Sequence, residues 1–327
     1  MGNHLTSSAD NIRYNGTGRA YIGDVGGTSL LDLGELDGFN LAVNVSKDSM
    51  KSTRNAAKAT ILTSESERSA SLSFGLQEQT EENLQMAFFG GSITSDDQSL
   101  GTVEDNQTTL VSDKHVDLGK VDVFVTKLTG TITGTLECGD TVTGASSSAE
   151  GKIAWTESGL VELISVSGTF TVGEKVEADI SNYITVTSIE VAEDVVVCDA
   201  AVGSGTPTTR YVQGTDYDLD VQYGYLRMLS AGSITSPAYV SFDYAAVTKN
   251  YFYGLGAATV QKKVVFVTDA DDDGLRHRIT VWKADINMNG DWSAIGDGPA
   301  PLPMEGTVIK DTTQSSGQEY FKHETFS

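Results

Sequence analysis

The sequence predicts a mainly β protein with one short helix and a small β module inserted into a larger β-sandwich or barrel. Three observations predict this fold class. Apolar residues recur at every second position in the clearest stretches, which is the period of a strand with one buried face. The 327-residue chain has 34 glycines and only five prolines, a balance that suits many turns between hydrogen-bonded strands. Two similar phrases in the middle of the chain indicate an internal repeat.

Two alternating stretches predict the first strand pair. Residues 39–45 place apolar side chains on one face, and residues 69–76 alternate serine or glycine with apolar residues in the same way. Residues 47–68 lie between them and are polar, so we expect a long loop there. Loops of this length inside a compact domain are usually functional, and the lack of aromatic residues favours a protein contact over a nucleic-acid contact. The charged residues of this expected contact loop are Lys47, Asp48, Lys51, Arg54, Lys58, Glu65, Glu67 and Arg68.

One helix is expected, over residues 81–89. Thr80 can cap its N-terminus, and the two glutamates that follow lie where the helix dipole favours acidic side chains. The glycine pair at 90–91 would supply a left-handed stop. The helix would dock on a sheet through one apolar face, formed by Leu84, Ala87 and Phe88.

Strands resume after the helix. They are expected at residues 121–125, 184–191, 211–217, 224–229, 238–244, 260–267 and 278–284. Residues 122–180 differ from their flanks because they contain GTITGTLECGDTV at 130–142 and GTFTVGEKV at 168–176. Each phrase predicts a strand, a tight turn at a Gly-acid pair, and another strand. We therefore expect a main domain in two parts, residues 1–121 and 181–327, with residues 122–180 as the inserted module.

The charge of the chain excludes one class of function. With 45 acidic and 22 basic residues, its formal net charge is −23 and its pI is near 4.4. A tight binder of nucleic-acid phosphates displays basic patches instead. The N-terminus lacks a basic segment followed by an apolar one, and no stretch approaches the ~20 apolar residues of a membrane span. We expect a protein made in a cytoplasm, without a secretory signal or a membrane partner.

Catalytic and metal motifs are not found in the sequence. Cys138 and Cys198 have no second ligand at zinc or CxxC spacing, and two free thiols are favoured over one disulfide. The four histidines are scattered, and no nucleophile elbow, Walker A sequence or dinucleotide fingerprint occurs. Chance pairs are common among so many carboxylates, so a glycoside hydrolase pair is not favoured. We expect no enzyme activity and no cofactor.

One local pattern resembles a calcium loop. Asp269, Asp271, Asp273 and Gly274 satisfy its DxDxDG opening, but the twelfth position, which needs a bidentate glutamate, is Thr280. The flanking segments read as strands instead of helices. A solvated Asp-Gly hairpin turn is therefore favoured over a weak calcium site.

Several phrases, taken in order, carry a resemblance to a known family. They are RAYIGDV at 19–25, the strand at 39–45 with the polar stretch after it, RSASLSF at 68–74, TEENLQMAFFG at 80–90, DYDLD at 216–220 with GYL at 224–226, KADI at 283–286, MEG at 304–306 and YF at 320–321. Together they resemble the major tail tube proteins of long-tailed bacteriophages. The resemblance covers most of the chain outside residues 122–180.

The resemblance implies a structural virion protein. Its β-sandwich or near-barrel would join side by side into homohexameric rings, and the rings would stack into the viral tail tube that conducts DNA during ejection. The polar stretch at 47–68 would contact a neighbouring ring, and the inserted module would face outward. Implied partners are further copies of the chain, the tape measure and tail terminator proteins, and double-stranded DNA in transient, non-specific passage. Assembly would occur in the host cytoplasm.

Two interpretations of the acidity stay open. A negatively charged bore would repel DNA phosphates and let the genome slide; alternatively, the acidic residues lie outside and aid solubility. Other function classes are a secreted or virion-surface adhesin that binds carbohydrate through aromatic residues, and a capsid decoration or tail-fibre-associated enzyme. Spacing in strands favours packing over sugar binding for most of the tyrosines and tryptophans.

Overall fold

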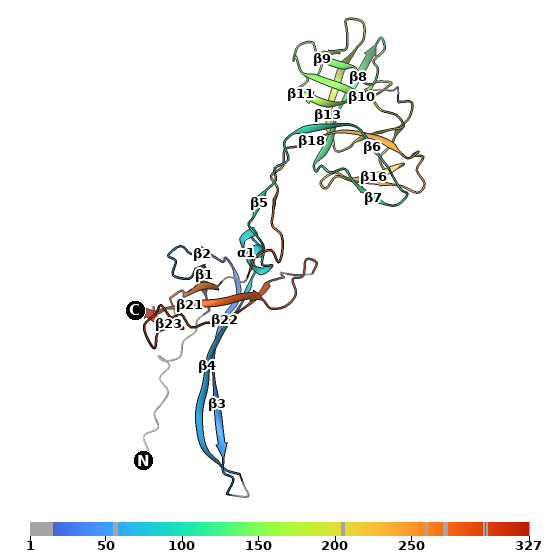
Figure 1. The fold of residues 1–327 in the computed structure, drawn as a ribbon. Coiled ribbons are helices and arrows are strands. Elements are labelled where there is room, and N and C mark those ends of the chain that lie inside the picture. Colours follow the sequence, from blue (N-terminus) through green and yellow to red (C-terminus); the bar gives the residue numbers. More distant parts are fainter. Residues whose placement is uncertain are drawn as a thin grey trace, which may run out of the picture. The chain divides into compact units, whose positions relative to one another are not determined.

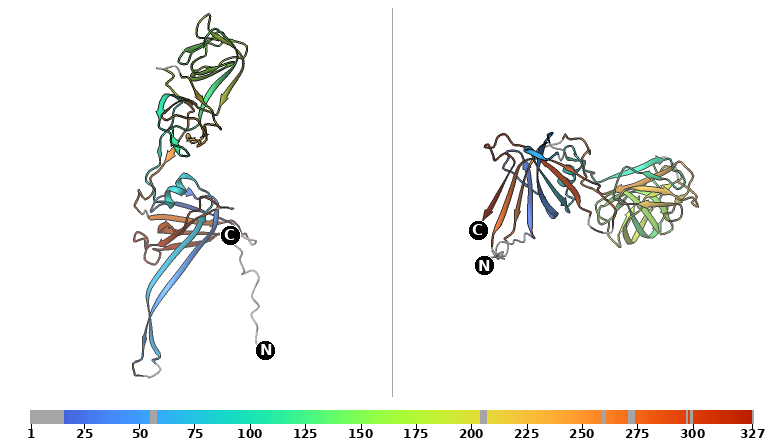
Figure 2. Two further views of the ribbon diagram at one scale, coloured as in Figure 1. Left: turned by 90° about the vertical axis from the view of Figure 1, so that its right-hand side faces the viewer. Right: turned by 90° about the horizontal axis from the view of Figure 1, so that it is seen from below.

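The computed structural model describes residues 16–54, 58–203, 207–258, 261–270, 274–296, 298 and 300–326 (Figures 1 and 2). The expected mainly β class is confirmed, and α1 (Glu81–Ala87) is the only helix in this part of the chain. Among the same residues, no helix has the length and apolar character needed to cross a bilayer. The chain divides into two compact units. Unit 1 is Met1–Thr94 with Tyr251–Ser327, and unit 2 is Ser95–Asn250.

Unit 1 is built on an antiparallel sheet with the order β2-β1-β20-β21-β22-β4-β3, and β23 also pairs with β21. Its strands are β1 (Gly18–Asp24), β2 (Leu31–Asp32), β3 (Leu36–Lys51), β4 (Thr60–Leu76), β20 (Gln261–Thr268), β21 (Arg276–Met288), β22 (Leu302–Val308) and β23 (Phe321–Phe326). Two short strands, β5 (Thr94–Ser95) and β19 (Asn250–Tyr251), pair with each other where the chain passes between the units.

The expected alternation of β3 and β4 gives the sheet of unit 1 an apolar face. Phe39 is opposite Phe74, and Leu41 is opposite Leu72. Because neighbouring strands in register place the same face together, these side chains continue into β22 and β21. The buried core on this face includes Ala20, Ile22, Leu72, Phe74, Leu76, Val264, Val281, Ile286, Leu302, Met304 and Val308.

The helix begins as expected and ends differently. The Asn83 N–H donates to Thr80 Oγ1 at 3.2 Å, which confirms the N-cap. The left-handed residue after α1 is Phe89, with φ of 49°, and not the predicted glycine pair. Gly90 is needed for another reason: a Cβ there would lie 2.4 Å from the Phe252 ring. Gly90 thus allows the Phe252 ring to pack closely against the backbone, and it does not supply the left-handed conformation that ends the helix.

Unit 2 contains a ten-stranded sheet, and six of its strands close into a barrel in the order β11-β10-β9-β12-β13-β8 through the pairing of β11 with β8. A three-stranded sheet, β16-β17-β7, completes the unit. The strands are β6 (Gly101–Thr108), β7 (His115–Asp117), β8 (Val123–Thr133), β9 (Thr141–Gly144), β10 (Glu150–Glu157), β11 (Leu160–Ser167), β12 (Lys175–Glu177), β13 (Tyr183–Ala192), β14 (Val196–Cys198), β15 (Arg210–Tyr211), β16 (Tyr217–Asp220), β17 (Tyr225–Met228) and β18 (Ala238–Tyr244).

The repeat seen in the sequence is a structural repeat of the barrel. If β8, β9 and β10 are exchanged with β11, β12 and β13, respectively, the set of strand pairings in the barrel stays the same. The two Gly-acid turns also match. Gly139 and Gly173 both have φ of 92°, and Asp140 and Glu174 each accept the N–H of the residue three positions earlier. Only the strand after the turn forms in the second phrase, because residues 168–174 are not in a strand.

The domain boundaries differ from the expected ones. The expected module, residues 122–180, begins close to β8 but omits β13, which completes the barrel by pairing with β8 and β12. The compact unit is also larger, because β6 and β18 on either side of the barrel pair with each other. The unit boundaries therefore lie at residues 94/95 and 250/251 instead of 121/122 and 180/181.

Most of the expected later strands exist. Residues 184–191, 224–229, 238–244, 260–267 and 278–284 overlap β13, β17, β18, β20 and β21, with residue 260 outside the described part, and β8 overlaps the last residues of 121–125. The strand expected at 211–217 is wrong. Its middle is a turn, in which the Val212 N–H donates to Asp216 Oδ2 at 2.8 Å and the Asp216 N–H donates back to the Val212 carbonyl at 2.8 Å.

Candidate assembly interface

The most distinctive feature of unit 1 is a two-stranded ribbon that extends beyond the rest of the sheet (Figures 1 and 2). β4 pairs with β22 only from Leu76 to Ala70. Beyond that point it pairs with β3 alone, from Asn44 opposite Ser69 to Lys51 opposite Thr60. We call residues 44–51 and 60–69 the arm.

The expectation of a loop at residues 47–68 is wrong, because most of this segment is strand. Its long run of exposed polar side chains looked like a loop, but a ribbon whose two faces both meet solvent carries polar side chains on both faces as well. Lys47, Asp48 and Lys51 lie in β3, and Glu65, Glu67 and Arg68 lie in β4. Arg54 and Lys58 lie between β3 and β4, on either side of residues 55–57, which are outside the described part of the chain.

Apolar side chains are exposed on the arm, with a cluster near its end. Met50 is opposite Leu62, and the register shifts between Met50 and Lys51, which leaves Ile61 as an extra residue of β4. Met50 and Ile61 are 60% exposed and Leu62 is 59% exposed. A bulge re-aims side chains, and an isolated two-stranded ribbon is only marginally stable in water. The arm is thus suited to being covered by another surface.

Charged pairs stiffen the middle of the arm. Arg68 Nη2 donates to Glu65 Oε2 at 3.1 Å, and Arg68 Nε also contacts this carboxylate. The hydrogen bond from Arg68, followed by its charge and that of Lys47, lowers the pKa of Glu65. Lys47 is directly opposite Glu65 in the register. These exposed pairs contribute little stability, but they fix the pattern of charge along the ribbon.

Both margins of the unit 1 sheet are open. In the part of the chain that the structure describes, β3 pairs with β4 alone, and the outer margin of β1 pairs only with the two-residue β2. Leu30 and Leu31 beside this margin are exposed. Unpaired strand edges are templates for pairing with another chain.

The second face of the unit 1 sheet is polar. One row across β3, β4, β22 and β21 is Asn40, Ser73, Glu305 and Asn287, and the next is Ala42, Ser71, Thr307 and Asp285. These two rows contain carboxylates but no lysine or arginine. These two rows therefore offer no cation to a phosphate.

The candidate calcium loop lies partly outside the described residues. Asp269 is exposed, and Asp271 and Asp273 lie outside the described residues. β20 and β21 pair up to Val267 opposite Arg278, so the segment joins the two strands of a hairpin. Within the described part of the chain, no group of three or more His, Cys, Asp or Glu residues could hold a metal ion.

Two side-chain clusters were not found from the sequence. In unit 1, His277 Nδ1 lies 3.2 Å from His323 Nε2, because β21 pairs with β23. Strand pairing over such a separation has no local signal in the sequence.

Both cysteines are free thiols, as favoured, and burial raises the pKa of Cys198 to about 12.

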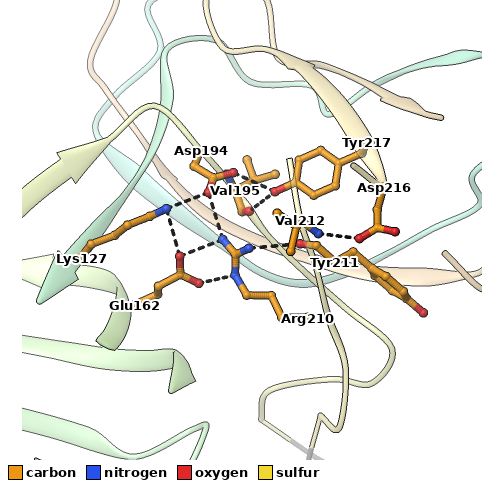
Figure 3. A network of polar contacts seen from close by, with 9 residues as sticks. All are labelled: Lys127, Glu162, Asp194, Val195, Arg210, Tyr211, Val212, Asp216 and Tyr217. Carbon is orange, nitrogen blue, oxygen red and sulfur yellow. Dashed lines mark hydrogen bonds and ion pairs between the residues drawn. The ribbon is translucent and has the colours of Figure 1, made fainter. Parts of the chain in front are cut away.

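The second cluster is a buried charge network in unit 2 (Figure 3). Lys127 Nζ lies 3.2 Å from Glu162 Oε1 and 2.9 Å from Asp194 Oδ2, and Arg210 binds both carboxylates. The Tyr217 hydroxyl lies 2.7 Å from Asp194 Oδ1. Burial acts to raise the pKa of Asp194, but the hydrogen bonds and nearby cations outweigh burial and lower it.

This network joins the barrel to the rest of unit 2. Lys127 and Glu162 come from β8 and β11 of the barrel, and Arg210 and Tyr217 come from β15 and β16. Two cations balance two carboxylates, and each cation contacts both carboxylates. This arrangement is that of an ion cluster that ties these strands together.

A family model described as "Protein of unknown function UCP028589" matches residues 161–322. The match begins in the barrel of unit 2 and extends into β23 of unit 1. No curated protein matches the chain.

Proposed function

We propose that the chain is a structural virion protein whose copies form hexameric rings that stack into the tail tube of a long-tailed bacteriophage. The observation that carries this proposal is the architecture of unit 1: a sheet open at both margins with an arm projecting from it. Copies joined margin to margin would form a heterologous contact, and such contacts close into rings when the rotation permits.

The polar face of unit 1 supports the conducting role. In a ring, the apolar face of each unit 1 sheet would pack away from water. The polar face would then line the bore. Rows of Asn, Ser and Thr with the carboxylates of Asp285 and Glu305 would not retain DNA phosphates. The overall charge of −23 acts in the same direction.

Negative-stain microscopy of the purified full chain tests the proposal. Six-fold rings or striated tubes are expected. Discrete monomers over a wide range of concentration would contradict the proposal.

A second candidate is a carbohydrate-binding surface protein. Tyr223 and Tyr225 are 62% and 42% exposed and stack with ring centroids 6.3 Å apart, whereas Tyr211 and Tyr217 are buried as expected. Exposed aromatic rings can stack on sugars. Glycan binding that Tyr225→Ala abolishes, without rings in the microscope, would favour this candidate.

A further inference from the structure

A groove beside α1 has a volume of about 570 Å³ and a mostly apolar lining. The acidic side chain of Glu82 also lines it. Lys262, which also lines it, is paired with Asp24 at 2.7 Å. The apolar side chains of the groove are Ile22, Leu31, Met86, Phe89 and Ile286.

The arm tip, which we define as Met50, Ile61 and Leu62, has matching chemistry. Its three apolar side chains are each about 60% exposed. The charges nearest to it are mainly basic: Lys51, Arg54 and Lys58, with Asp48 as the acidic residue. An apolar tip with neighbouring basic side chains complements an apolar groove that contains Glu82 and a lysine already paired with an aspartate.

The tip cannot reach the groove of its own copy. The arm extends about 23 Å from Ser69 to Leu62 at the rise of a strand. Figures 1 and 2 show that α1 lies towards one end of unit 1 and that the arm projects from the other end. An occupant with the chemistry of the tip must therefore come from another molecule.

We propose that the arm tip of one copy occupies the α1 groove of a second copy. This inference rests on the proposed function and names the surface that receives the arm. Because donor and acceptor lie at opposite ends of unit 1, the contact repeats in one direction and stacks copies along the arm. Such a head-to-tail contact is open, unlike the ring contact along the sheet margins.

Cysteine cross-linking tests the contact. Ser92 is exposed at the groove, so the double variant Leu62→Cys, Ser92→Cys places one thiol on each surface. Assembled full chain is treated with a mild oxidant and separated without reductant. We expect a ladder of covalent oligomers from the double variant. Each single variant, which retains Cys138 and Cys198, is the control and should stay at the monomer position.

A second variant separates this inference from the proposed function. Leu62→Asp should give single rings without stacks, whereas Ile180→Asp, a change at an exposed apolar residue of unit 2, should leave stacking intact. Normal tubes from Leu62→Asp without a cross-link in the cysteine variant would overturn the groove assignment and leave the tube function standing. If the wild-type chain forms neither rings nor tubes, both proposals fail.

Discussion

At the scale of single residues, Glu174 makes the barrel sensitive to acid. Its carboxylate accepts the N–H groups of Ser146, Ser147 and Thr171, and two serine hydroxyls as well. Burial opposes ionisation, but these hydrogen bonds lower the pKa of Glu174 to about 2. A carboxylate whose pKa is lowered by folding stabilises the fold fully at pH values above its pKa in the unfolded chain, which is about 4.5. This contribution is lost as the pH falls towards 2.

We therefore predict that Glu174→Gln destabilises unit 2 at pH 7 by about 1.5–3 kcal/mol, because hydrogen bonds to a charged group are lost. The loss should shrink as the pH falls from 4.5 to 2. Thermal unfolding from pH 2 to pH 7 measures both effects. Glu150→Gln, at an exposed position of β10, is the control, and an equal effect from it would contradict the role of Glu174.

The charge network gives a second prediction at this scale. Lys127→Met removes one of two cations that neutralise two buried carboxylates, so it should cost about 3–5 kcal/mol. Lys310→Met removes an exposed partner of Glu319 and should cost less than about 1 kcal/mol. Urea unfolding of the full chain compares the two. Equal costs would show that the network contributes no more than a surface pair.

At the scale of elements, the arm can be removed without touching the sheet. Ser46 and Glu67 are directly opposite each other, so replacing residues 47–66 with Asn-Gly makes a two-residue hairpin turn. The core on β3 and β4 ends before this point, and the shortened chain should keep its β circular dichroism. It should form rings that do not stack. Normal tubes from the shortened chain would show that the arm is not the stacking element.

The arm also illustrates what the sequence could predict. Period two located the buried side chains of β4 and the half-buried Phe39 and Leu41 of β3, since apolar alternation reports a face that meets a core. It did not hold for Val43 and Val45, which are 59% and 47% exposed. It failed for residues 47–68, where both faces meet solvent and alternation disappears although the strand continues. The expected contact loop therefore falls on the arm, where its contact role stays a prediction, and its secondary structure was not predicted. Likewise, the expected module left out β13, because the strand pairing that closes the barrel is long-range and has no local signal in the sequence.

Turn chemistry was predicted only in part. The repeat was visible because Gly139 and Gly173 both need a left-handed backbone. At the end of α1, the same reasoning failed, because packing against Phe252 and not dihedral freedom requires Gly90. The turn at 212–216 was missed because its apolar and aromatic ends resemble a strand, while Asp216 organises the backbone between them.

At the scale of the whole molecule, a sheet open at both margins should be sensitive to one charge at its margin. Leu31 in β2 is 45% exposed, and Leu31→Lys would bury an ammonium group in a margin-to-margin contact. We predict monomers in place of rings by size-exclusion chromatography. Val191→Lys, at a 64% exposed residue of unit 2, should leave the rings unchanged. Rings from the Leu31→Lys variant would exclude this margin from the interface.

The position of charge, more than its total, should decide how an assembled ring treats DNA. Asp285→Lys with Glu305→Lys changes the net charge of the chain from −23 to −19, and the new lysines lie on the polar face of unit 1. If this face lines the bore, variant tubes should retain double-stranded DNA at low salt and release it as the salt concentration rises. Wild-type tubes should not retain it.

A matched variant makes this prediction specific. Glu150→Lys with Asp218→Lys gives the same net charge of −19 but changes exposed residues of unit 2. Electron microscopy of tubes mixed with DNA, together with a filter-binding assay across salt concentrations, compares the two. DNA retained only by the unit 1 variant would place the repelling charge on the conducting face, because counterion release depends on where phosphate and cation meet. Equal retention by both variants would assign the acidity to solubility alone.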